Sequence, residues 1–446
     1  MEELSQRLGA VQRLIEQAPD GAMGMLASAL TSGVDDAESA ALIQTLVSTE
    51  ALERRTRAAV LEPLLPFCDP SERGMRRVAF PVSAPALTWR GLKTAHPDGV
   101  AVALEAFAAH VGGDSPPLVY DQLCLRAAEG LRTDAEPFRP LAKSLTALDP
   151  KALQLFADGL ALMPLARRAI RRLPSRMRPI GDEQAAALKL AFRDAASIGE
   201  ETAPLFMEIL MSRLETPTEV LRLISLVSDR AGDSYLAGSE LASFGERLLD
   251  DLEQRIDDIR RFHAPDGRVA GERLAASVQT ATSMVGEFER WIALRRDGPW
   301  GARIHAARGA LAHAVEARLR EVEAALDAAL PTLPNMGSRR LRGPPRLTSD
   351  PDPEAVRKAE ALLALLFQTR NSASHGGFGA LRSRVLETID PRLDHYVESL
   401  LDLLHAGGGG APPERIRAYL EVAAEFVGLV RDPSAGAIVR RRIAAA

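Results

Sequence analysis

The chain has 446 residues, with 55 basic and 60 acidic side chains, a formal net charge of −5, and aromatic residues at only 4% of the sequence. The lack of a basic excess argues against a protein that coats nucleic acid nonspecifically. Because Ala and Leu dominate the apolar residues and runs of β-branched and aromatic residues are missing, the composition predicts an all-α fold. Cys68 and Cys124 are far apart and outside any C-x-x-C pattern, so we expect no metal site, disulfide or cofactor.

Two features of the sequence bear on where the protein works. No stretch of about 18 apolar residues is present, so a membrane-spanning helix is not expected. The chain starts with an acidic amphipathic segment, MEELSQRLGAVQRLIEQ, which lacks the basic start and apolar run of a secretory signal. We therefore expect a cytoplasmic protein without membrane contact.

Residues 1–235 are predicted to form an α-helical interaction region of stacked helical hairpins. Apolar residues recur at intervals of three and four, and helices are expected to start near Asp35, after Pro150 and after Gly181. No fixed repeat period is found. The segment 69–97 contains several prolines and is expected to be a packed connector. We expect this half to bind a protein partner.

Residues 236–446 are predicted to form an antiparallel helical bundle. Their first helix places Leu249, Leu252, Ile256 and Ile259 at alternating intervals of three and four, which is the pattern of a short coiled-coil seam. Because the seam covers barely two heptads, packing within the chain is favoured over binding of a partner helix.

A proline-rich loop is expected at residues 331–353, with six prolines, two glycines and four arginines. The arginines are candidate phosphate-binding residues: Arg339, Arg340, Arg342 and Arg346. A solvated flexible loop without a ligand is the alternative interpretation.

One short motif carries chemistry, and it follows this loop. A helix is expected to run from about residue 354 to the paired glycines Gly376 and Gly377, which suit a helix C-cap. Asn371 and His375 would then share one helix face, four residues apart, with the long Arg370 side chain in reach. Arg308 and His313 repeat the Arg–His spacing without an asparagine, and we give that pair no weight.

These three side chains suit RNA cleavage without a metal. The reaction needs a group that takes the 2′-hydroxyl proton, a donor for the leaving oxygen, and fixed positive charge near phosphorus. His375 would serve as base or acid, Arg370 would bind phosphate oxygens, and Asn371 would orient the phosphate or the imidazole. Because one copy supplies one histidine at this motif, a homodimer could combine the acid and the base at a symmetric interface.

The stretch Arg370-Asn371-Ser372-Ala373-Ser374-His375 resembles the R-N-x-x-x-H signature of HEPN domains. The resemblance implies a small helical bundle, often dimeric, that acts as a metal-independent ribonuclease or binds RNA, with Arg370, Asn371 and His375 at the active site. It covers this motif and, by helical pattern, residues 268–435, but not the N-terminal half. The alternative is a noncatalytic α-helical scaffold or adaptor, in which the motif only ends a helix.

Overall fold

The computed structural model describes residues 37–69, 78–109, 116–172, 182–199, 201–214, 216–228, 230–263, 267–334, 343–407 and 410–446, together with Leu14, Met25 and Ala29. Within these ranges every regular element is a helix, and β-type pairing is confined to two isolated bridges. The predicted all-α fold class is therefore confirmed. The chain divides into two compact units, Met1–Glu219 and Val220–Ala446. The sequence pattern had placed the boundary near residue 235.

The first unit consists of short and medium helices. They are α3 (Ala37–Leu61), η2 (Glu62–Cys68), α4 (Ala84–Ala95), α5 (Pro97–Ala109), α6 (Leu118–Arg132), η4 (Glu136–Phe138), α7 (Arg139–Leu148), α8 (Ala152–Arg172), α9 (Asp182–Ala196) and α10 (Thr202–Met211). Helix α8 packs against α6, α9 and α10. A buried guanidinium ties three of these elements together, because Arg167 of α8 pairs with Asp121 of α6 and donates to the carbonyl oxygen of Val60 in α3.

The expected connector at 69–97 is wrong over its second half, where α4 forms. Proline lies in the first turn of α4, where its missing N–H group has no helical partner to lose, so it starts the helix instead of breaking it. Trp89 of this helix is 3% exposed and belongs to the core.

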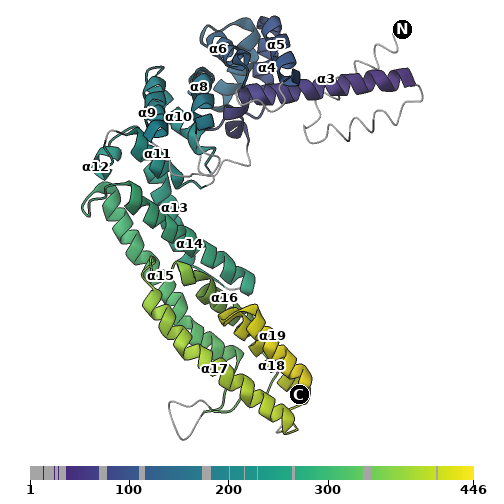
Figure 1. Ribbon diagram of the computed structural model, residues 1–446, viewed down its shortest axis with the longest axis vertical. Helices are drawn as coiled ribbons and strands as arrows, with labels where there is room; N and C mark the ends of the chain where they lie inside the picture. Colours follow the sequence, from purple (N-terminus) through teal and green to yellow (C-terminus); the bar gives the residue numbers. More distant parts are fainter. Residues whose placement is uncertain are drawn as a thin grey trace. The chain divides into compact units, whose positions relative to one another are not determined.

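The second unit is built from longer helices. They are α11 (Glu219–Val227), α12 (Asp233–Leu236), α13 (Ala242–Arg260), α14 (Arg268–Trp291), α15 (Pro299–Ala329), α16 (Pro353–Gln368), η5 (Thr369–Asn371), α17 (Gly379–His405), α18 (Pro413–Val430) and α19 (Pro433–Ala445). Helix α16 contacts α14, α15 and α18, and α17 lies beside α15 and α18 (Figure 1).

The apolar seam of α13 is buried within the unit. Leu249, Leu252, Ile256 and Ile259 are each at most 2% exposed, and α13 contacts α14 and α15. Beside the seam, the fully buried Trp300 ring lies against Gly245, where an added Cβ would stand within 2.9 Å of Trp300 Cε2. These contacts support the interpretation of the seam as packing within the chain.

A close backbone approach fixes the position of α16 against α14. A Cβ added to Gly271 of α14 would stand 2.7 Å from the carbonyl carbon and 2.8 Å from Cα of Ala361 in α16. The two helices therefore touch through their backbones at this point, which only glycine allows. Because the segment from Arg370 to His375 comes just after α16, this crossing helps to set where that segment lies.

Candidate functional site

The side chains of Asn371 and His375 line an open groove with a volume of about 390 Å³ in the second unit. One wall is helix α14, which contributes Gln279, Ser283 and Arg290 among others. Helix α15 contributes Arg308. Gly286 of the same α14 wall leaves open space, because a Cβ added there would meet no atom within 4 Å.

The helix that precedes this groove is shorter than expected. We predicted that it would reach Gly376, but α16 ends at Gln368 and is followed by the single 3-10 turn Thr369–Asn371. Two hydroxyl groups donate hydrogen bonds to backbone carbonyl oxygens here. Thr369 Oγ1 donates to the carbonyl oxygen of Leu365 at 2.7 Å, and Ser372 Oγ donates to that of Thr369 at 3.2 Å. The backbone then continues as a hydrogen-bonded turn, in which the N–H of Gly376 donates to the Ser372 carbonyl oxygen at 2.7 Å.

His375 lies in one further helical turn, which a glycine closes. The N–H of Gly377 donates to the Ser374 carbonyl oxygen at 3.3 Å, and the N–H of Phe378 donates to that of Ala373 at 3.1 Å. With Gly377 at φ +79°, this is the Schellman pattern of a helix C-terminus. Phe378 is fully buried and anchors the turn. Gly377 thus has the expected capping role, at the end of a short turn and not of a long helix.

The groove presents two free polar side chains. Asn371 and His375 are both exposed, and among the described residues neither side chain makes a hydrogen bond or ion pair with another protein group. An amide and an imidazole without protein partners are available to a ligand. Asn371 and His375 were expected to lie together, and both line the same groove. Asn371 does so from a 3-10 turn and His375 from the helical turn that follows, instead of from one α-helix.

Two arginines that the motif did not indicate also line the groove. Arg308 Nη1 pairs with Glu289 Oε1 at 2.8 Å, and the Arg290 guanidinium lies 5.0 Å from the centroid of the Trp291 ring. Among the described residues, Arg290 makes no ion pair. Arg308 had appeared in the sequence only in a discounted pair with His313, and nothing in the spacing pointed to Arg290. Both arginines are far from His375 in the sequence, and the packing of α14 and α15 brings them to the same groove.

Arg370 is not among the groove-lining residues. Its guanidinium carbon lies 5.0 Å from the centroid of the Phe367 ring. Arg382 is close by and donates from Nε to the carbonyl oxygen of Leu366 at 2.7 Å. Burial, together with the positive charge of Arg370, lowers the pKa of Arg382. The structure therefore brings together two of the three motif side chains and places the third in a separate cationic pair.

The loop arginines lie away from the groove where the structure describes them. Arg339, Arg340 and Arg342 fall outside the described residues. Arg346 is exposed, its Nε donates to Thr348 Oγ1 at 3.3 Å, and its backbone N–H donates to the Pro331 carbonyl oxygen at 2.9 Å. Pro331 follows the end of α15, about 33 Å along that helix from Arg308. Arg346 and His375 therefore do not contact the same phosphate.

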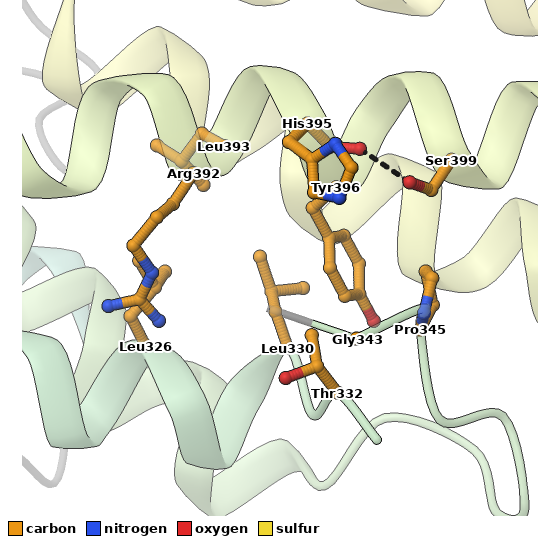
Figure 2. A pocket seen from close by; sticks show the side chains of 10 residues that line it. All are labelled: Leu326, Leu330, Thr332, Gly343, Pro345, Arg392, Leu393, His395, Tyr396 and Ser399. Carbon is orange, nitrogen blue, oxygen red and sulfur yellow. Dashed lines mark hydrogen bonds between the residues drawn. The ribbon is translucent and has the colours of Figure 1, made fainter. Parts of the chain in front are cut away.

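A second cavity lies between the end of α15 and the middle of α17 (Figure 2). Its volume is about 30 Å³, which is enough for about two water molecules. Among the described residues the Tyr396 hydroxyl has no hydrogen-bond partner, although the side chain is only 5% exposed, and burial raises its pKa. Arg392 faces Asp327 and forms an ion pair with it. A nucleotide would not fit, so we do not assign a substrate to this cavity.

The described ranges of the chain offer no metal-ligand cluster and no membrane-spanning helix. These ranges hold no cluster of three or more His, Cys, Asp or Glu side chains arranged as metal ligands, and no helix in them is long and apolar enough to cross a membrane. Both cysteines are buried and free. Comparison with protein-family models, with curated proteins and with solved structures finds no match to this chain.

Proposed function

We propose that this chain is a cytoplasmic RNA-binding protein that cleaves RNA without a metal, and that the groove at the end of α16 is its active site. The observation that carries the proposal is the free imidazole of His375 in an open groove that Arg290 and Arg308 also line. The groove is large enough for a nucleotide unit, and the guanidinium groups suit phosphate oxygens.

Each groove side chain has a distinct part in this reaction. Arg290 makes no ion pair among the described residues and is available for a phosphate oxygen. Arg308 must share or leave Glu289 to do the same. Asn371 can donate from its amide to a phosphate oxygen or hold the ribose. His375 transfers the proton, because an imidazole nitrogen can either accept or donate one.

The proposed chemistry is an internal transfer within the RNA. The 2′-oxygen attacks phosphorus, forming the P–O2′ bond while the P–O5′ bond breaks. The 2′-hydroxyl loses its proton to a base and the leaving 5′-oxygen gains one from an acid, so the products are a 2′,3′-cyclic phosphate and a 5′-hydroxyl. With His375 in one of these roles, the other falls to a groove carboxylate such as Glu289 or to His375 of the partner subunit in a homodimer.

A cleavage assay with matched variants tests the proposal. Wild-type protein is incubated with a labelled single-stranded RNA in EDTA, and the ends of the products are identified. We expect cyclic-phosphate ends, a loss of at least about 100-fold in rate for His375→Ala, and no change for His313→Ala, which alters an exposed histidine of α15 outside the groove.

Two results would overturn parts of the proposal. One is that neither the wild type nor His375→Ala cleaves RNA at high protein concentration. If the wild type nevertheless binds RNA and Arg308→Gln weakens that binding, the groove is a binding site without catalysis. If RNA neither binds nor is cleaved, the alternative of a noncatalytic helical scaffold replaces it. For the first unit, we keep the prediction of a protein partner, for which the exposed Leu118 and Leu190 are candidate contacts.

A further inference from the structure

Two neighbouring arginines, Arg370 and Arg382, form a cationic pair beside the motif but not in the groove. Arg370 directly precedes Asn371, so the pair begins where the groove wall begins. Their charges are near enough for Arg370 to lower the pKa of Arg382, where burial is the larger cause. Within the described part of the chain, neither guanidinium forms an ion pair with a carboxylate.

Several other arginines of the same unit do contact described carboxylates. Arg303 contacts three carboxylates, Arg431 contacts two, and Arg442 makes two 2.6 Å bonds with Glu398. Two like charges held together oppose each other, and an anion between them relieves that repulsion. The pair therefore has the charge of an anion site.

The geometry also leaves donors free for such an anion. Arg382 uses Nε for the Leu366 carbonyl oxygen, one of the last acceptors of α16, and this bond fixes the side chain at the helix C-terminus. Its two terminal nitrogens make no hydrogen bond with a described residue. Arg370 rests on the partly exposed ring of Phe367, which orients the guanidinium without occupying its N–H groups.

We propose that Arg370 and Arg382 bind a second phosphate of the RNA strand whose scissile phosphate lies in the groove. This inference rests on the proposed function and specifies its substrate as a strand of at least two phosphates. It also gives Arg370 a binding role outside the reacting centre. A substrate with one phosphate meets only the groove, whereas a longer strand gains the contact at the arginine pair.

The test compares a dinucleotide, UpU, with a labelled 12-residue oligouridine. We measure binding of the 12-mer by fluorescence anisotropy over a range of salt, and cleavage of both substrates, with the full chain. The variants are Arg370→Gln and Arg382→Gln, alone and together. Arg384→Gln is the matched control, because Arg384 is an exposed arginine two residues further along α17 and points from another face of that helix.

For the double variant we expect about tenfold weaker binding of the 12-mer. The slope of log affinity against log salt should fall by about 0.7, the value for one lost phosphate contact on a single strand. Cleavage of UpU should stay within about twofold of wild type. Circular dichroism checks that Arg382→Gln leaves the fold intact. Arg370→Gln, which removes no side-chain hydrogen bond to a described residue, must shift the slope in the same direction.

The inference and the proposed function fail in different ways. If the double variant binds the 12-mer like the Arg384→Gln control while His375→Ala abolishes cleavage, the second phosphate contact is refuted and the active site stands. If UpU cleavage falls with that of the 12-mer, the arginines act at the scissile phosphate and the second-site assignment is wrong. If the wild type neither binds nor cleaves RNA, the proposed function itself fails.

Discussion

Replacing Gly271 with alanine tests the backbone contact that sets α16 against α14. The new Cβ would stand 2.7 Å from the carbonyl carbon of Ala361, whereas carbon atoms in good contact are about 3.5–4.0 Å apart. The helices must therefore separate by about 1 Å at this point. Neither contacting group is the tip of a flexible side chain, so relief requires movement of a packed helix.

The expected magnitude follows from two opposing effects. Overpacking of a core costs typically about 1–3 kcal/mol, and a backbone clash lies at the upper end. Alanine is a better helix former than glycine by about 1 kcal/mol, which offsets part of this. Gly271→Ala should therefore lower the free energy of unfolding by about 2 kcal/mol. Gly286→Ala in the same helix should raise it by up to about 1 kcal/mol, since its Cβ meets no atom within 4 Å.

Urea unfolding followed by tryptophan fluorescence measures the difference. Of the three tryptophans, Trp291 and Trp300 lie in the second unit, so a Trp89→Phe background makes the signal report that unit. The two glycine variants should differ by about 3 kcal/mol, or roughly 6–12 °C in melting temperature for a unit of this size. Equal stability of the two variants would refute the close approach of α14 and α16.

Three further predictions concern buried side chains. Phe378→Ala should lower the free energy of unfolding by about 3–5 kcal/mol because this ring is fully buried, and a loss below about 1 kcal/mol in the urea assay would contradict its anchoring role. Burial raises the pKa of Cys68 to about 12 and that of Cys124 to about 11. Both thiols should therefore resist Ellman's reagent at pH 8 until urea unfolds the first unit. Rapid reaction in the native protein would contradict this burial. Tyr396→Phe should leave thermal stability unchanged or slightly raised, because its hydroxyl has no partner among the described residues. A loss above about 1 kcal/mol would reveal a bond to a group in the cavity.

The part of the site that the sequence predicted is local in the chain. Asn371 and His375 are four residues apart, and paired glycines follow them, so their shared location and the glycine cap were predictable from spacing. The end of α16 at Gln368 was not predictable, because neither the apolar periodicity nor the glycine pair marks the 3-10 turn that follows it. Arg370 was expected beside His375, yet it rests on Phe367, a contact that spacing alone does not select.

By itself, the sequence determined the helical class and the burial of the α13 seam, since both follow from composition and from apolar residues at intervals of three and four. The tertiary structure alone decided which charged groups join His375. Arg290 and Arg308 come from helices about 70–85 residues earlier in the chain, and their approach depends on how α14 and α15 pack against the end of α16. Helix packing is set by side-chain shape and by contacts such as Gly271 with Ala361, which no periodicity in a single sequence encodes.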